Sequence, residues 1–248
     1  MTKILICGIG GKMGKNLVEL LETESDAKVV CGVDLHAENC GKTPIYASFN
    51  DVSEDVDVII DFSSPTVLKS ETEWAIKHKC PIVLATTGYS ESDLKLIDEC
   101  AKKIAIFKTA NFSLGVNLLV KLVREAAEAL KENFDIEIIE KHHHLKADAP
   151  SGTALMLAES ANSAFKNEKP VLNGREGAVG KRGNEIGIHA VRGGTIVGEH
   201  DVMFAGEDEI ITLSHSARSK KVFAAGAIRA AKWICGKPAG KYDMTDVL

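Results

Sequence analysis

The sequence lacks the features that mark several large classes of protein. It has no apolar stretch of membrane-spanning length, no block of basic residues and no Cys-x-x-Cys pair. These absences argue against a membrane protein, a nucleic-acid-binding protein and a zinc ribbon. A strand-like run begins at Lys3 and leaves no room for a signal peptide, so we expect a cytoplasmic protein with no membrane or nucleic-acid partner.

What remains is the composition of a globular protein. The chain has 248 residues, of which 45% are apolar, and its 35 acidic and 30 basic residues are interspersed. This length allows one large domain or two modest ones. The cysteines lie far apart, mostly in apolar runs, so we expect buried free thiols and no disulfide framework; they are Cys7, Cys31, Cys40, Cys80, Cys100 and Cys235.

The first 110 residues alternate short apolar runs with stretches of helical character. Continuous apolar strands separated by helices are typical of a parallel sheet covered on both faces. The predicted strands are residues 3–7, 28–33, 56–62, 81–85 and 104–107, and the predicted helices include residues 12–22 and 91–102. We therefore expect an α/β fold whose N-terminal part is a parallel sheet.

The pattern changes after residue 110. A mixture of long helices and alternating strands predicts an α+β part with an antiparallel or mixed sheet. Two of its strands flank Gly193-Gly194, which predicts a tight hairpin. The expected helices are 114–131, one beginning near Ser151, and 222–235, which we expect to pack back on the first part; the expected strands are 135–142, 186–192, 195–204 and 209–216.

A glycine-rich turn follows the first predicted strand directly. The strict Gly-x-Gly-x-x-Gly fingerprint fails because residue 13 is methionine, but Gly8-x-x-Gly11-x-x-Gly14 fits. Such glycines let a backbone approach a pyrophosphate at a helix N-terminus, and Asp34, at the end of the second strand, suits the ribose hydroxyls. The alternative is a glycine turn of an α/β fold that binds no nucleotide. No arginine follows Asp34 to bind a 2′-phosphate, so the sequence favours NADH over NADPH.

A second chemical signal lies in residues 140–155, which contain His142, His143 and His144. Ser151-Gly152-Thr153 follows a proline and opens a helix, where N–H groups and hydroxyls bind carboxylate or phosphate. Lys146 can supply positive charge to the same ligand, and a histidine beside such a pocket is suited to proton donation near neutral pH. The residues therefore predict an acidic small substrate, a nicotinamide cofactor and a proton donor, which together describe a reductase.

The histidines have two alternative interpretations, a zinc site and a solvated strand end. Zinc would require three or four ligands in a tetrahedral array, and no partner cluster stands out in the sequence, so we predict no metal. A solvated strand end would explain the histidines alone. It would not explain Lys146 or the Ser-Gly-Thr helix start.

These residues resemble the dihydrodipicolinate reductase family, whose members are 4-hydroxy-tetrahydrodipicolinate reductases. The stretch Glu140 to Ala154 resembles the family's histidine signature, which is highly specific, and further segments resemble the family in its order along essentially the whole chain. These segments are Gly8-x-x-Gly11-Lys-Met-Gly14, Asp57-Val-Ile-Ile-Asp61-Phe62, Thr86-Thr87-Gly88, Asn111 to Asn117, Arg192 to His200 and Asp243 to Leu248.

The resemblance implies a Rossmann-type, doubly wound dinucleotide-binding domain of residues 1–110 with 217–248. It implies that residues 111–216 form a substrate-binding and tetramerisation domain. The implied reaction uses NADH or NADPH to reduce 4-hydroxy-tetrahydrodipicolinate to tetrahydrodipicolinate with loss of water, in lysine and diaminopimelate biosynthesis. The implied partners are a small dicarboxylate substrate and further copies of the chain in a homotetramer.

The resemblance also implies roles for individual residues. His142 and Lys146 match the family's proton-transferring residues. The substrate-binding positions, including those proposed above from the residues alone, are His143, Ser151, Gly152, Thr153 and Thr87. The cofactor-binding positions are Gly8, Ile9, Gly10, Gly11, Lys12, Met13, Asp34, Ala85, Thr86, Thr87, Thr109, Ala110, Asn111 and Phe112.

The chain departs from the family at Ala85, where glycine is usual, and at Lys12, where arginine is common, and both departures bear on cofactor fit. Rival functions are another Rossmann dehydrogenase of small amino or keto acids, and a nucleotide-sensing protein without turnover. The histidine and Ser-Gly-Thr arrangement argues against the first. The presence of His142, Lys146 and Thr153 argues against the second.

Overall fold

The computed structural model describes residues 1–36 and 43–248. The described residues divide into two compact units. Unit 1 consists of Met1–Ser113 and Lys221–Leu248, and unit 2 consists of Leu114–Lys220. The first unit is therefore built from both ends of the chain, and the second is one continuous segment.

Unit 1 is a parallel sheet with the strand order β12-β6-β5-β4-β1-β2-β3. This confirms the predicted doubly wound, Rossmann-type fold class. Its strands are β1 (Thr2–Cys7), β2 (Ala27–Val33), β3 (Ile45–Tyr46), β4 (Val58–Asp61), β5 (Ile82–Leu84), β6 (Ala105–Lys108) and β12 (Gly240–Tyr242). Its helices are α1 (Lys12–Leu21), η1 (Phe49–Asp51), η2 (Pro65–Val67), α2 (Leu68–His78), α3 (Glu91–Ala101) and α6 (Lys221–Ile234).

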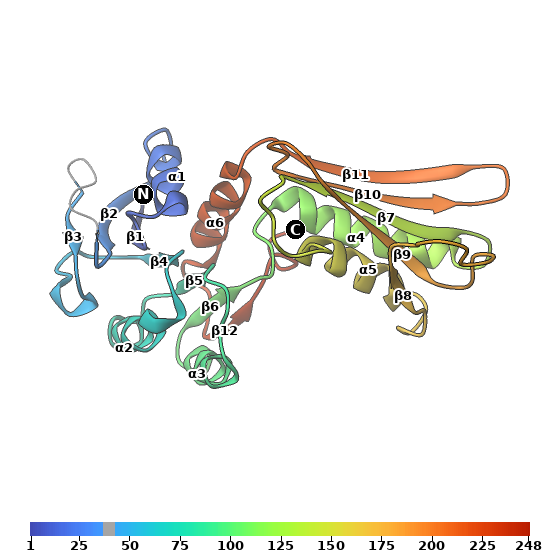
Figure 1. The fold of residues 1–248 in the computed structure, drawn as a ribbon. Helices are drawn as coiled ribbons and strands as arrows, with labels where there is room; N and C mark the ends of the chain where they lie inside the picture. Colours follow the sequence, from blue (N-terminus) through green and yellow to red (C-terminus); the bar gives the residue numbers. More distant parts are fainter. Residues whose placement is uncertain (37–42) are drawn as a thin grey trace. The chain divides into compact units, whose positions relative to one another are not determined.

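Helices cover both faces of this sheet (Figure 1). α1 packs against α6, and α2 packs against α3. The central strands have apolar side chains in both directions, and Ile4, Leu5 and Ile6 of β1 are all 0% exposed. A continuous apolar run is what a strand between two helical layers requires. The predicted return of the last helix to the first sheet is confirmed, because α6 packs on α1 and β12 pairs with β6.

Unit 2 is a mixed sheet with the strand order β11-β10-β7-β9-β8, and α4 and α5 pack on one of its faces (Figure 1). In the central strand β7, side chains alternate between buried and partly exposed positions, as a strand with one covered face requires. The strands are β7 (Asp135–His142), β8 (Val171–Asn173), β9 (Ile186–Arg192), β10 (Gly198–Ala205) and β11 (Ile210–Ala217), and the helices are α4 (Leu114–Leu130) and α5 (Gly152–Ser163).

The tight hairpin predicted around Gly193-Gly194 is wrong. β9 and β10 both pair with β7, β9 in parallel and β10 antiparallel, so β7 lies between them. The turn between them therefore crosses over the end of β7. Gly193 donates its N–H to the carbonyl of His142 at 2.9 Å, and His144 donates to the carbonyl of Gly194 at 3.2 Å.

The described cysteines are free thiols, and all but the half-buried Cys235 are buried, as expected. Cys40 lies outside the described residues. Among the helices in the described part of the chain, none combines the length and the apolar character needed to span a bilayer.

Candidate active site

A pocket lies in unit 1 where the order of the strands reverses. β1 lies between β2 and β4, and the chain continues from these two neighbours towards opposite edges of the sheet. Open α/β sheets bind their ligands at such a reversal of strand order. The pocket has a volume of about 660 Å³. It is lined at the ends of these strands by Gly8, Gly11, Asp34, Phe62 and Ser63, with Ser48 and Phe49 among its other lining residues.

The glycine turn is tightly packed against its surroundings. Gly8 has a φ of +79°, and a Cβ on this residue would lie 2.8 Å from the carbonyl oxygen of Phe62. A Cβ on Gly14 would lie 2.3 Å from the carbonyl oxygen of Gly8. These two positions accept only glycine, which brings the start of α1 close to the turn as a dinucleotide site requires.

Asp34 lies at the end of β2 and holds the glycine turn through its carboxylate. Its Oδ2 accepts a hydrogen bond from the backbone N–H of Gly10 at 2.9 Å, and its Oδ1 accepts one from the N–H of His36 at 2.9 Å. The sequence predicted Asp34 at the end of this strand. In the structure, hydrogen bonds also fix its carboxylate to the glycine turn.

The other predicted cofactor residues lie at the same edge of the sheet. Lys12 and Met13 begin α1, residues 85–87 follow β5, and residues 109–112 follow β6. None of these lines the pocket described above. Ile9 is 0% exposed, and its side chain lies against Gly32 of β2.

Two buried carboxyl groups lie in the same unit and were not singled out from the sequence. Asp61 ends β4, is 1% exposed, and accepts hydrogen bonds from the N–H of Ser63 at 2.8 Å and the hydroxyl of Tyr89 at 3.3 Å. Glu71 of α2 is 0% exposed, and neither carboxyl oxygen has a hydrogen-bond partner among the described residues. Burial, followed by the nearby Asp61, raises the pKa of Glu71 well above its usual value.

The predicted histidine site of unit 2 is organised by Glu140. This carboxylate is 0% exposed on β7. It accepts hydrogen bonds from both terminal nitrogens of Arg192 at 2.7 and 2.8 Å, from Nδ1 of His142 at 2.6 Å and from the N–H of Ser151 at 2.9 Å. Burial acts to raise the pKa of Glu140, but these hydrogen bonds outweigh it and lower the pKa. The group is therefore an ionised carboxylate.

Ser151 links this carboxylate to the start of α5. Its Oγ accepts a hydrogen bond from the N–H of Ala154 at 3.2 Å, which caps the helix. The same Oγ lies 3.0 Å from Nε2 of His200. The aligned peptide dipoles of α5 give its first residues, Gly152 and Thr153, a partial positive charge that favours an anion.

The remaining predicted residues of this stretch precede that helix start in the chain. Lys146 is half-buried and donates a hydrogen bond from Nζ to Oδ1 of Asp148 at 2.8 Å. His143 is partly exposed; burial, and then the charge of Lys220, lowers its pKa below the usual value for histidine. Thr87 belongs to unit 1, whereas His142, Lys146 and Ser151 to Thr153 belong to unit 2.

Sequence reasoning missed the polar partners of His142. Glu140 was within the singled-out stretch and Arg192 and His200 were within a family-like segment, but none was given a role. The alternation of β7 was the available signal for Glu140, since residues 136, 138, 140 and 142 share one face of the strand. Arg192 and His200 come from strands β9 and β10, whose pairing with β7 was not predicted.

Metal binding finds no support in the described residues, where no group of three or more histidine, cysteine, aspartate or glutamate side chains is arranged to hold an ion. His142 donates its hydrogen bond to the carboxylate of Glu140, whose negative charge is already balanced by Arg192.

Unit 1 combines a Rossmann-type sheet with a glycine turn and a pocket where the strand order reverses, and unit 2 holds a buried histidine paired with a carboxylate. These features are typical of nicotinamide-dependent oxidoreductases. This chain falls in that class of enzymes.

Comparison with known proteins agrees with this class and identifies the family. Residues 2–112 match the family model described as dihydrodipicolinate reductase, N-terminus, and residues 115–248 match the one described as dihydrodipicolinate reductase, C-terminus. The chain belongs to the dihydrodipicolinate reductase family.

Individual relatives cover the whole chain. A 4-hydroxy-tetrahydrodipicolinate reductase of Caldanaerobacter subterraneus subsp. tengcongensis is 49% identical over 100% of this chain and 98% of its own. The enzyme of the same name from Clostridium novyi is 44% identical over 100% and 98%. The solved structure of a dipicolinate-bound dihydrodipicolinate reductase from Paenisporosarcina sp. TG-14 is 26% identical, with a TM-score of 0.84 over 100% of both chains.

Proposed function

We propose that this enzyme reduces 4-hydroxy-tetrahydrodipicolinate to tetrahydrodipicolinate with loss of water, using NADH or NADPH, in lysine and diaminopimelate biosynthesis. Membership of the family supports this reaction. The observation that carries it in the chain itself is the ionic cluster in which Glu140 holds both His142 and the start of α5. It joins a proton-transferring group to an anion-binding site, as the reduction of an acidic substrate requires.

The substrate is a small dicarboxylate, and the start of α5 is its anion site. The helix dipole at Gly152 and Thr153 and the cap residue Ser151 suit a carboxylate, and the ammonium group of Lys146 adds positive charge. His143 is a hydrogen-bonding contact, and Thr87 is a contact from unit 1. A relative's structure with bound dipicolinate supports a ligand of this class.

His142 transfers the proton and Lys146 supports it. The His142 side chain is 11% exposed, so it is shielded from bulk water but retains some accessible surface. Its Nδ1 is held by Glu140, which leaves Nε2 as the ring atom available to a substrate. Lys146 binds substrate charge and is the alternative proton donor.

The residues of unit 1 fit a nicotinamide dinucleotide. Gly8 and Gly14 have no room for a Cβ, and Asp34 faces the pocket with a carboxylate suited to ribose hydroxyls. When bound, the reduced dinucleotide supplies the hydride. Its remaining contacts are assigned to Ile9, Gly10, Gly11, Lys12, Met13, Ala85, Thr86, Thr87, Thr109, Ala110, Asn111 and Phe112.

NADH is the favoured cofactor because Asp34 places negative charge where a 2′-phosphate would add more. Residues 1–110 with 217–248 form the dinucleotide-binding domain, and residues 111–216 form the substrate-binding domain. The latter also assembles a cytoplasmic homotetramer through its sheet.

The first test is the loss of NADH or NADPH absorbance with substrate freshly generated by the preceding synthase from pyruvate and aspartate semialdehyde. We expect substrate-dependent oxidation, with a higher specificity constant for NADH. His142→Gln is expected to lower turnover by about 100-fold while dinucleotide affinity stays unchanged. Dinucleotide binding without any oxidation would overturn the reaction and favour a sensing role.

A further inference from the structure

Two glutamates of β7 each hold arginine and histidine side chains, on opposite faces of the strand. Glu140 shares its face of the strand with Ile136 and Ile138, which pack against α5, and Glu137 lies on the other face. Only the first of these clusters contains a predicted catalytic residue.

The hydrogen bonds of Glu140 use both of its oxygens. Oε1 accepts from Nη2 of Arg192 and from the N–H of Ser151, and Oε2 accepts from Nη1 of Arg192 and lies 2.6 Å from Nδ1 of His142. An ionised carboxylate can only accept hydrogen bonds. Nδ1 of His142 must therefore carry a hydrogen, and the free lone pair of the neutral ring lies on Nε2.

We propose that Glu140 is a positioning residue that holds His142 as its Nδ1–H tautomer, so that Nε2 is the atom that exchanges a proton with the substrate. This inference rests on the proposed function, because it deepens the role given to His142. Through the N–H of Ser151, the same carboxylate also fixes the start of α5. One buried group thereby sets the proton-transferring atom and the anion site relative to each other.

The surroundings of Nε2 are consistent with this role. A Cβ on Gly198 would lie 3.0 Å from Nε2, so the glycine at the start of β10 preserves the space around this atom. The ring of His200 lies edge-on to that of His142, with 5.2 Å between centroids. Burial, and then the proximity of His142, lowers the pKa of His200 to about 4, so it stays neutral, and its own Nε2 bonds with Ser151.

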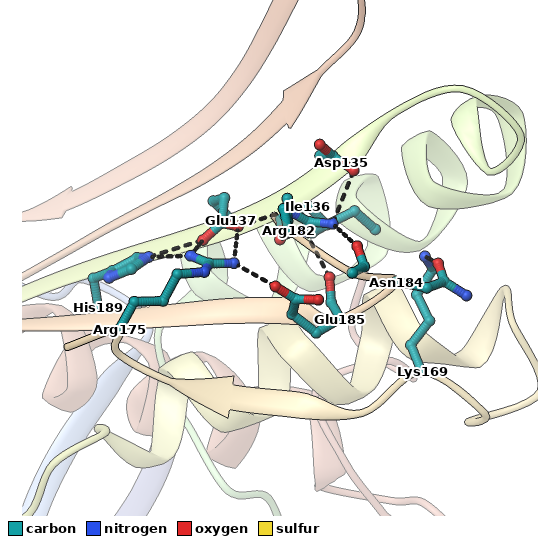
Figure 2. A network of polar contacts seen from close by, with 10 residues as sticks. Asp135, Ile136, Glu137, Lys169, Arg175, Arg182, Asn184, Glu185 and His189 are labelled. Atoms are coloured by element: carbon teal, nitrogen blue, oxygen red, sulfur yellow. Dashed lines mark hydrogen bonds and ion pairs between the residues drawn. The ribbon is translucent and has the colours of Figure 1, made fainter. Parts of the chain in front are cut away.

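The second cluster supplies a matched control. Glu137 accepts hydrogen bonds from Arg175 at 2.8 and 3.0 Å and from Arg182 at 3.0 Å, and it lies 2.8 Å from Nε2 of His189 (Figure 2). It has the same chemistry on the same strand. Its hydrogen bonds within the described part of the chain involve no residue assigned to the substrate, so its loss tests the effect of removing a half-buried, arginine-paired carboxylate from β7.

The direct test is ¹⁵N nuclear magnetic resonance of histidine-labelled protein. The spectra are recorded about two units above the ordinary imidazole pKa of about 6.5, and the His142 signals are assigned by their absence in His142→Gln. We expect the wild-type ring to be protonated at Nδ1 and unprotonated at Nε2. A ring protonated at Nε2 in the wild type would overturn the proposal, and this arm needs no Glu140 variant to fold.

The variants test the kinetic consequence. Glu140→Gln is expected to weaken the preference for the Nδ1–H tautomer, because the amide NH2 can donate to Nδ1 where a carboxylate can only accept, and to lower turnover by about 100-fold with unchanged dinucleotide affinity. Glu137→Gln is expected to keep the tautomer and the turnover of the wild type. An unchanged tautomer and turnover in folded Glu140→Gln would refute the positioning role.

The two proposals fail in different ways. If the wild type shows the expected tautomer but oxidises neither dinucleotide, the assigned reaction is wrong and the geometry stands. If it reduces the substrate with a ring protonated at Nε2, the reaction stands and the positioning role of Glu140 is wrong.

Discussion

The carboxylate of Asp34 accepts a hydrogen bond from the backbone N–H of Gly10 at 2.9 Å. This bond joins the end of β2 to the glycine turn after β1. The acid therefore has a structural partner as well as its proposed ribose contact. It also keeps a negative charge beside the pocket.

Asp34→Asn removes that charge and keeps an oxygen able to accept from Gly10. We expect the ratio of the NADPH to the NADH specificity constant to rise by about tenfold, or about 1.4 kcal/mol, because repulsion of a 2′-phosphate is relieved. Steady-state kinetics with both dinucleotides measure the ratio. Asp98→Asn, on the outside of α3, is the control and should leave it unchanged. An unchanged ratio in Asp34→Asn would show that this carboxylate does not select the cofactor.

Lys146→Ala removes an ammonium group that we assign to the substrate site. We expect the specificity constant for the substrate to fall by about 10- to 100-fold, mostly through a raised KM, because a charged contact to a carboxylate is lost. Lys141→Ala is the matched control, since Lys141 pairs with Glu199 and Asp201 on the other face of β7. If both KM and turnover of Lys146→Ala equal those of the wild type, Lys146 has no part in the site.

The buried carboxyl group of Glu71 has no hydrogen-bond partner among the described residues. Glu71→Gln replaces it with a neutral amide of similar shape. The pKa of Glu71 is raised in the folded chain, so above about pH 4.5 the unfolded chain ionises this group more readily. The wild type therefore loses up to about 1.4 kcal/mol of stability per pH unit above that pH, until the folded-state pKa is reached. We expect the variant to raise Tm more at pH 8 than at pH 5.

Scanning calorimetry at both pH values measures this difference. Glu73→Gln, an exposed position of the same helix, should show little difference between them. A Glu71→Gln variant less stable than the wild type at pH 8 would mean that the carboxyl group has a stabilising partner.

Glu137 should have the opposite dependence on pH. Burial acts to raise its pKa, but hydrogen bonds from Arg175, His189 and Arg182 lower it from 4.5 to about 2. Its contribution is therefore present above about pH 4.5 and is lost as the pH falls towards 2, and it amounts to at most about 3 kcal/mol. Urea unfolding should show that Glu137→Gln is less stable than the wild type at pH 6, with a smaller difference at pH 3. A constant difference would contradict the pKa shift.

The sequence predicted individual elements well where one periodicity dominated. Residues 135–142 were predicted as one strand and form β7 with those limits, and the strand of residues 186–192 is β9. Strand order was not available from such local patterns. β9 and β10 both pair with β7, and two strands joined by a glycine pair look the same in sequence whether they pair with each other or with a third strand between them.

The site shows the same division. His142, Ser151 and Lys146 were proposed for the site because they lie close together in one short stretch of the sequence. Arg192 and His200 reach the site through strand pairing across about fifty residues, and so no local spacing indicated them. The burial of Glu71 was not predicted for another reason: a charged residue in an amphipathic helix is normally expected to face solvent.

The way the two units share the chain has a consequence for biosynthesis on the ribosome. The segment 114–220 emerges as one uninterrupted piece and can complete its sheet as soon as β11 is made. The sheet of unit 1 must wait for α6 and β12, which are made last and cover strands synthesised at the beginning. Until then, the apolar surface that α6 later buries is open to chaperones, so a nascent chain stalled before residue 221 would carry a finished unit 2 and an unfinished unit 1.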